Sequence, residues 1–412
     1  MSILAQALQL PCGVTLPNRL CKAAMTEGLA DEHLRATPRH NTLYRRWAEG
    51  GAGLLISGNV MIDRRVLERP GNVAIDGNGG MQQLKDWARA GTSAGNHLWM
   101  QISHAGRQSP RYVTGEPLAP SAVGLDIFGN YARPRALRED EILDFIQRYA
   151  RVAATAREAG FTGVQVHAAH GYLLSSFLSP VTNRRTDAWG GSLENRARML
   201  LEVLRATRKA VGADFPVALK LNSDDFRKGG FSSEDCLQVV QLLGRESVDL
   251  LEISGGTYEQ PKLLGFTGKT DSIVPQREST RVREAYFLDY AVAIRKIATM
   301  PLMVTGGFRS RAGMEAAIDA GECDVIGLGR PLCTEADVPR RLLSGEISEA
   351  PATEKSLRLG PGKLFSGVSP VFLFKIVHVL GLQGWYYQQI AHMADGGREP
   401  LQRSVFGAFI AY

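Results

Sequence analysis

Short apolar segments alternate with longer amphipathic segments along most of this chain. The apolar segments are nearly continuous in aliphatic residues, as expected of strands buried on both faces of a parallel sheet. The amphipathic segments carry apolar residues at helical spacing. The pattern predicts strands at residues 19–25, 53–61, 97–104, 163–167, 216–221, 250–254, 301–305 and 324–328, and helices at residues 39–49, 82–94, 139–159, 193–211, 233–246, 283–298, 311–320 and 335–343.

Eight strand–helix units in succession predict an α/β fold, the closed (β/α)8 TIM barrel. An open doubly wound sheet would normally carry a Gly-x-Gly-x-x-Gly turn after one strand, and this chain has none. Residues 1–17 are expected to form an N-terminal hairpin that closes the floor of the barrel. We therefore assign residues 1–345 to the barrel and residues 346–412 to a C-terminal extension.

The extension has apolar residues at helical spacing over residues 371–380, followed by Trp385-Tyr386-Tyr387. Lys375 and His378 interrupt the apolar segment, which is too short to span a bilayer. We expect the extension to pack on the barrel or on a partner subunit, in preference to a membrane surface. A homodimer would be one such arrangement.

Composition and charge narrow the class of protein. Of the 412 residues, 44% are hydrophobic and 22% charged, which excludes a mostly disordered chain, a collagen and a coiled coil. The net charge of +6 is dispersed, whereas a nucleic-acid-binding protein would concentrate it in a stripe. The five cysteines include no Cys-x-x-Cys pair, which argues against disulfides or structural zinc. With no secretory leader or membrane-length apolar segment, we expect a cytoplasmic protein.

The fourth predicted strand ends in His-Ala-Ala-His-Gly-Tyr, residues 167–172. His167 and His170 would point to opposite faces of a continuing strand, so they converge only if the strand ends near Ala168. A zinc site would need a third ligand that the sequence does not offer, and we predict no metal. The alternative is one buried structural histidine and one loop histidine. Together with Tyr172, the two histidines suit a carbonyl substrate, because imidazole N–H groups can hold the oxygen while the phenol offers a proton.

The last two predicted strands end in glycines followed by arginine, in the loops that usually form the phosphate site of a TIM barrel. One glycine pair alone would mean little, since turns need glycine, but two such loops predict a phosphate-bearing ligand. Three further strand ends add donors and one fixed positive charge to the same pocket. The phosphate residues are Gly306, Gly307, Phe308, Arg309, Gly329 and Arg330; the other strand ends supply Ala24, Met25, Thr26, Gln101 and Lys220.

From about residue 16 to residue 332 the sequence resembles the old yellow enzyme family of FMN-dependent NADH:flavin oxidoreductases, or ene-reductases. The most specific block runs from residue 167 to residue 196 and contains His-Ala-Ala-His-Gly-Tyr, Phe-Leu-Ser-Pro, Asn-Arg-Arg-Thr-Asp and Trp-Gly-Gly-Ser-Leu-Glu-Asn-Arg. Further matches are Pro-Asn-Arg at residues 17–19, Ala-Met-Thr at 24–26, Ser-His-Ala-Gly-Arg at 103–107 and Leu-Ala-Pro-Ser at 118–121.

The resemblance implies a tightly but non-covalently bound FMN and NAD(P)H as a transient hydride donor. Thr26 and the backbone near Ala24 and Gly58 would contact the flavin N5/O4 edge, and Gln101 the pyrimidine ring. Lys220 would face N1 and the C2 carbonyl, and the glycine–arginine loops would hold the phosphate. His167 and His170 would bind the carbonyl of a small enone-type substrate, and Tyr172 would protonate Cα after hydride reaches Cβ.

Three positions depart from the family pattern. Thr26 stands where many bacterial relatives have a redox-tuning cysteine, Gly28 near a substrate-contacting tyrosine, and Lys220 where many have arginine. The departures leave other acceptors open, such as nitro compounds, quinones or oxygen. A non-redox lyase or isomerase that binds a phosphorylated substrate is one further alternative, and a catalytically silent flavin- or ligand-binding protein that works through its C-terminal extension is another.

Overall fold

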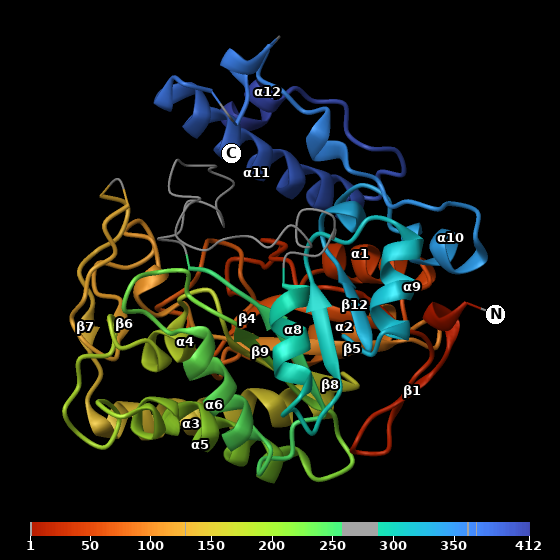
Figure 1. Ribbon diagram of the computed structural model, residues 1–412. Coiled ribbons are helices and arrows are strands. Elements are labelled where there is room, and N and C mark those ends of the chain that lie inside the picture. The colour runs from red at the N-terminus through yellow and green to blue at the C-terminus, as the bar shows by residue number, and fades with distance from the viewer. Residues whose placement is uncertain (1, 128, 258–286, 361, 368) are drawn as a thin grey trace.

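The computed structural model describes residues 2–127, 129–257, 287–360, 362–367 and 369–412, and eight of its described strands close into a parallel barrel (Figure 1). Their order around the barrel follows the chain, as the predicted (β/α)8 fold requires. The barrel strands are β3 (Leu20–Lys22), β4 (Leu54–Met61), β5 (His97–Ser103), β8 (Gly163–Ala168), β9 (Val217–Asn222), β10 (Leu250–Ser254), β11 (Leu302–Thr305) and β12 (Val325–Leu328).

The helices surround the barrel at nearly the predicted positions. Among them, α3 begins with three acidic residues and ends at Gly160, whose φ of 93° suits the left-handed cap. The predicted helix 335–343 begins later, with Pro339 in its first turn. Residues 283–286 of the predicted helix 283–298 lie outside the described residues. The helices over the barrel are α1 (Pro38–Glu49), α2 (Met81–Gly91), α3 (Glu139–Ala159), α4 (Leu173–Leu178), α5 (Leu193–Val211), α6 (Ser233–Leu243), α8 (Leu288–Arg295), α9 (Arg311–Asp319) and α10 (Val338–Ser344), with 3-10 turns η1 (Ile3–Ala5), η2 (Gly106–Gln108) and η3 (Arg330–Cys333).

The predicted N-terminal hairpin is confirmed and closes the floor of the barrel. Strands β1 (Leu8–Gln9) and β2 (Thr15–Leu16) pair antiparallel, and β6 (Leu118–Ala119) and β7 (Arg135–Ala136) form a separate small sheet. The hairpin contributes Leu10 and Leu16 to an apolar cluster with inward-facing strand residues. That cluster includes Cys21, Leu54, Ile56, Trp99, Ala218, Leu250, Met303 and Val325.

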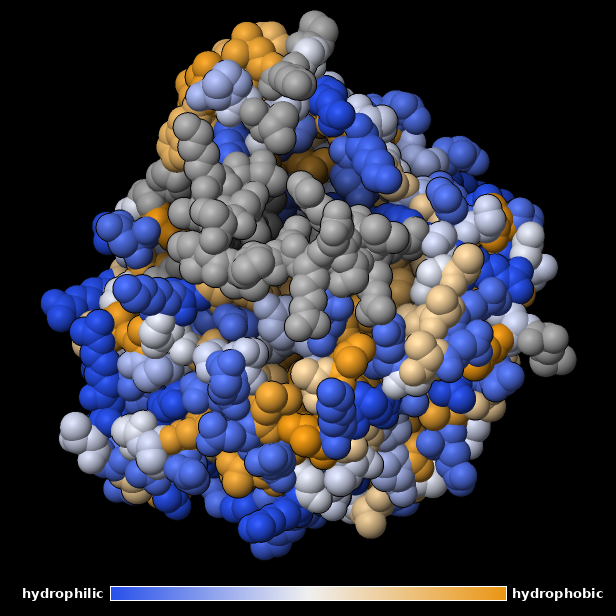
Figure 2. Space-filling view, viewed as in Figure 1, coloured by the Kyte–Doolittle hydropathy of each residue, from blue (hydrophilic) through white to orange (hydrophobic). Residues whose placement is uncertain are grey.

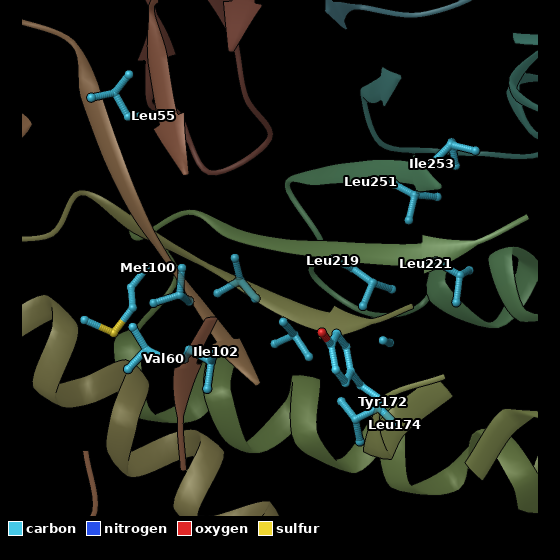
Figure 3. Packing of buried hydrophobic residues seen from close by; sticks show 14 of the residues in the cluster. Leu55, Val60, Met100, Ile102, Tyr172, Leu174, Leu219, Leu221, Leu251 and Ile253 are labelled. Carbon is cyan, nitrogen blue, oxygen red and sulfur yellow. The ribbon is translucent and has the colours of Figure 1, made fainter. Parts of the chain in front are cut away.

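The outward-facing strand residues pack against the helices in the main hydrophobic core. Leu219 and Leu221 flank Lys220 on β9, and Leu251 and Ile253 flank Glu252 on β10 (Figure 3). Because side chains alternate along a strand, the apolar residues face the helices while Lys220 and Glu252 face the barrel axis. The barrel interior is therefore apolar at the hairpin end and polar at the carboxyl ends of the strands.

The C-terminal extension contains η4 (Thr353–Lys355), η5 (Lys363–Phe365), α11 (Phe372–Ala394) and α12 (Val405–Ile410). It lies over the carboxyl-end side of the barrel (Figure 1), where Arg39 of α1 pairs with Asp395 at 2.7 Å. In the described part of the chain, no helix is both long and apolar enough to cross a membrane.

Several apolar side chains of the extension are exposed, and Figure 2 shows apolar surface at the top of the view, where α11 and α12 lie. The division of the chain at residue 345, a partner subunit and a cytoplasmic location all stay predictions. The exposed residues are Leu364, Val371, Phe372, Leu373, Leu380, Phe406, Ile410 and Tyr412.

Candidate active site

A chain of buried polar side chains crosses the upper interior of the barrel. The Gln101 amide of β5 donates to Gln165 Oε1 of β8 at 2.7 Å, and Gln165 Nε2 donates to Glu252 Oε2 of β10 at 2.8 Å. Lys220 Nζ of β9 lies 2.9 Å from Glu252 Oε1. All four side chains are at most 5% exposed. Charge-assisted and amide hydrogen bonds thus hold these groups in one orientation.

The pairing with Glu252 adds a counter-ion to the fixed positive charge that the sequence places at Lys220. A buried ammonium is costly without a counter-ion, and Glu252 lies beside it because their strands pair in register. The sequence analysis missed Glu252 and Gln165. A signal was present, because each is a polar residue inside an otherwise apolar strand.

His167, His170 and Tyr172 lie together at the end of β8. The His167 ring centroid is 5.1 Å from that of His170 and 4.9 Å from that of Tyr172, with edge-to-face geometry in both cases. Strand β8 ends at Ala168, as convergence of the two histidines required. The turn that follows brings both imidazoles to one side.

The His170 backbone has a φ of 61°, which is unusual for a residue other than glycine. Two side chains hold it: Asn222 Oδ1 accepts from the His170 N–H at 3.0 Å, and Gln108 Nε2 donates to its carbonyl at 2.9 Å. Such backbone strain persists only where the surroundings impose it. The hydrogen bonds with Asn222 and Gln108 therefore fix the position of His170.

Both imidazoles are held neutral. Burial, with His170 and Lys220 nearby, keeps the pKa of His167 well below its usual range, and burial with Lys220 does the same for the pKa of His170. The Ala169 N–H donates to His167 Nδ1 at 3.2 Å, so the proton of neutral His167 is on Nε2. His170 Nε2 lies 2.6 Å from Ser254 Oγ. When the Ser254 hydroxyl donates to His170 Nε2, the His170 proton is on Nδ1, and each neutral histidine then presents one N–H donor.

Residues that follow β3, together with Gly58 inside β4, form a second group. A Cβ placed on Gly58 would lie 2.5 Å from the Met25 carbonyl, and a Cβ on Gly329 would lie 3.8 Å from Met25 Sδ. The half-buried Ala24 and Thr26 flank Met25. The structure thus brings the predicted residues of the flavin edge beside the predicted phosphate loop of β12.

Glu27 is a buried residue of this group that the sequence analysis missed. Its Oε1 accepts from the Gly58 N–H at 2.9 Å and from the Tyr44 hydroxyl. Only the tertiary fold brings Gly58 and Tyr44 to it, so no local pattern identified it.

The two predicted phosphate loops lie at the ends of the neighbouring strands β11 and β12. Gly306 and Gly307 have φ values of 114° and 95°, a region that strongly favours glycine. Phe308 is buried beneath them. Arg309 Nη2 donates to Glu354 Oε1 at 2.7 Å, and Arg330 Nη1 lies 3.5 Å from the same oxygen. Glu354 belongs to the extension, and the sequence analysis missed it.

This donor set fits FMN. The glycine turns and two guanidiniums carry more positive than negative charge and suit a phosphate. The amide and ammonium groups of Gln101 and Lys220 suit the carbonyls and ring nitrogens of an isoalloxazine. FMN would supply hydride transfer between a nicotinamide and an acceptor.

Comparison with known proteins places the chain in a family. Residues 8–349 match the NADH:flavin oxidoreductase / NADH oxidase family. The NADH-dependent flavin oxidoreductase iccE of Talaromyces variabilis is 34% identical, over 96% of this chain and 99% of that protein. The NADH-dependent flavin oxidoreductase iliE of Neonectria sp. (strain DH2) is 39% identical over 83% of this chain, but the match spans only 47% of that protein.

Solved structures agree with the sequence relatives. The old yellow enzyme homologue from Zymomonas mobilis superposes with a TM-score of 0.69 at 28% identity, covering 84% of this chain and 93% of that one. Morphinone reductase superposes with a TM-score of 0.70 at 26% identity, covering 85% and 91%. The predicted resemblance is confirmed, and the chain belongs to the NADH:flavin oxidoreductase / NADH oxidase family, the family of old yellow enzyme.

Proposed function

We propose that this protein is an FMN-dependent reductase of α,β-unsaturated carbonyl compounds that uses NAD(P)H as hydride donor. The observation that carries the proposal is the cluster of His167, His170 and Tyr172, with two neutral imidazoles and a phenol beside one another. Such a cluster suits an acceptor whose oxygen gains negative charge while a neighbouring carbon gains a proton.

In the proposed reaction, bound FMN would supply to Cβ of the enone a hydride taken from NAD(P)H, and a proton would be added at Cα, so that the C=C bond is reduced. His167 donates its Nε2–H to the carbonyl oxygen and stabilises the developing enolate, and His170 assists. Tyr172 is the general acid that protonates Cα. Since one pocket serves donor and acceptor in turn, a ping-pong sequence is expected.

The same proposal assigns the cofactor contacts. Ala24, Met25, Thr26 and Gly58 would line the N5/O4 edge, and Gln101 and Lys220 the pyrimidine end. The phosphate would lie in the β11 and β12 loops, and is the group that Arg309 and Arg330 would hold.

A second acceptor class follows from another relative. The NADH oxidase of Thermoanaerobacter brockii is 34% identical over 82% of this chain, although the match spans only 50% of that protein. Oxygen is therefore an alternative acceptor on the same flavin scaffold, and the quinones and nitro compounds that the sequence analysis left open are further candidates.

The test is anaerobic reduction of the purified holoenzyme with NADH or NADPH, followed by addition of 2-cyclohexenone while the flavin absorbance is recorded. Rapid reoxidation with formation of cyclohexanone is expected. Flavin that reduces normally, ignores the enone and reoxidises with oxygen or a quinone would favour the alternative. Protein that cannot take up FMN would contradict both.

A further inference from the structure

Glu354, in turn η4 of the C-terminal extension, connects the two arginines of the phosphate loops. Its Oε1 accepts from Arg309 Nη2 at 2.7 Å and lies 3.5 Å from Arg330 Nη1. The Tyr386 hydroxyl of α11 donates to Glu354 Oε2 at 3.0 Å. The extension that the sequence left unexplained therefore reaches the predicted cofactor site through one carboxylate.

The carboxylate is fixed in place on the extension. The Glu354 side chain is 17% exposed and that of Arg309 15%, whereas that of Arg330 is 45% exposed. Burial, with Glu354 nearby, raises the pKa of Tyr386 far above its usual range, so the phenol remains a donor at every physiological pH. An ion pair with this degree of burial is less screened than a surface pair.

Glu354 does not occupy the backbone N–H groups of the glycine turns in the phosphate loops. Within the described residues, its side-chain partners are the two guanidiniums, the Tyr386 phenol and its own backbone N–H, and none is a backbone N–H of Gly306, Gly307 or Gly329. The N–H groups of the glycine turns can therefore bind an anion while Glu354 pairs with the two arginines. Two guanidiniums against one carboxylate still leave a net positive charge for that anion.

We propose that Glu354 is a positioning residue of the FMN phosphate site and that the C-terminal extension is thereby part of this site. The inference rests on the phosphate assignment in the proposed function. Arg330 is long and nearly half exposed, so without Glu354 it would have to be ordered when the phosphate binds. Holding it beforehand reduces this entropic cost of binding.

The test is titration of deflavinated full-length protein with FMN and, separately, with riboflavin, which lacks the phosphate, monitored by flavin fluorescence. The ratio of the riboflavin Kd to the FMN Kd measures the phosphate contribution. We expect Glu354→Ala to lower this ratio about tenfold by raising the FMN Kd alone. Glu354→Gln, which keeps the shape and loses the charge, should lower it less.

Asp395→Asn is the matched control, because it removes another carboxylate that joins the extension to the barrel, on Arg39. It should leave the ratio unchanged. An unchanged or higher ratio in Glu354→Ala, or an equal loss of FMN and riboflavin affinity, would overturn the inference. Tighter FMN binding would mean that Glu354 competes with the phosphate.

The Arg330→Ala variant distinguishes a wrong role for Glu354 from a wrong assignment of the phosphate site. If wild-type protein binds riboflavin as tightly as FMN, or if Arg330→Ala leaves the ratio unchanged, the phosphate assignment itself is wrong. If Arg330→Ala lowers the ratio and Glu354→Ala does not, only the role of Glu354 is overturned.

Discussion

At the residue scale, His167 and His170 differ in what holds them, although they are three positions apart. His167 is oriented by the Ala169 N–H on its Nδ1, whereas the His170 ring meets Ser254 and its backbone is held by Asn222. Neutral imidazoles on one side of the strand end can share one acceptor oxygen. Their proposed role therefore depends on hydrogen bonding and not on charge.

Replacing both histidines, as His167→Ala/His170→Ala, is expected to weaken binding of phenolic ligands and enones about 100-fold, since two donors to the ligand oxygen are lost. FMN should stay bound. Phenol titration of the oxidised holoenzyme, read from the charge-transfer band, measures the effect. Loss of FMN instead would show that the pair is structural.

Tyr172→Phe is expected to slow the enone-dependent reoxidation step about 100-fold, because the general acid is lost. Reduction by NAD(P)H should be nearly unchanged, since that step needs no proton at Cα. Stopped-flow measurement of the two half-reactions separates them. Equal slowing of both would remove Tyr172 as proton donor.

At the element scale, Gly327 of β12 pairs with Thr305 of β11, the strand that carries the other phosphate loop. A Cβ at Gly327 would lie 1.9 Å from Thr305 Oγ1 and 2.8 Å from Met303 Cε. A side chain at this position would therefore force the Thr305 and Met303 side chains to shift.

Gly327→Ala is accordingly expected to lower the free energy of unfolding by about 1–3 kcal/mol through overpacking and to weaken FMN binding. Gly115→Ala is the control, since a Cβ there meets nothing within 4 Å. Urea denaturation and FMN titration of both variants provide the measurement. Equal stability of the two variants would contradict the expectation.

Helix α11 contacts a second edge of the site through Tyr387, whose ring centroid lies 3.7 Å from the Arg69 guanidinium carbon. A Cβ on Gly28 would in turn lie 3.7 Å from Arg69 Nε. The arginine thus lies near the place where the family resemblance implied a tyrosine.

We expect Tyr387→Ala to raise the KM for the enone a few-fold, because the cation–π contact that orders Arg69 is lost, while the FMN Kd stays unchanged. Tyr387→Phe keeps the ring but loses the hydrogen bond of the hydroxyl with Arg69, so its KM should lie between those of wild type and Tyr387→Ala. Steady-state kinetics on both variants check this. An unchanged KM in Tyr387→Ala would mean that the contact does not shape the substrate pocket.

At the scale of the whole molecule, buried neutral histidines make the fold sensitive to acid. Burial lowers the pKa of His104 to about 4. In the unfolded chain the pKa is about 6.5, so below that pH the unfolded state takes up a proton that the folded state does not. Stability is therefore full above pH 6.5 and falls as the pH drops toward 4.

Between pH 7.5 and 5.5, His104 alone should reduce the free energy of unfolding by about 1.4 kcal/mol. In His104→Gln this part of the pH dependence should disappear, whatever the stability of the variant at neutral pH. Urea denaturation of both proteins at the two pH values measures the difference. An identical pH dependence would show that His104 titrates normally in the folded state.

The alternation of apolar and amphipathic segments determined the barrel by itself. Helices α3 and α5 and strand β10 match the predicted bounds, because hydrophobic periodicity and end signals are properties of neighbouring residues. The His-Ala-Ala-His-Gly-Tyr block and the glycine–arginine loops indicated the chemistry, since a barrel strand delivers its last residues to one known rim.

Only the tertiary structure decided which charges meet. Two ion pairs join residues of different elements, Glu252 with Lys220 and Glu354 with the two arginines of the phosphate loops. A third carboxylate, that of Glu27, accepts from the Gly58 N–H. Such pairs depend on strand register and on where the extension docks, neither of which leaves a local pattern in the chain. The polarity of each strand end could thus be read from the sequence, whereas its net charge depended on a partner that folding brought to it.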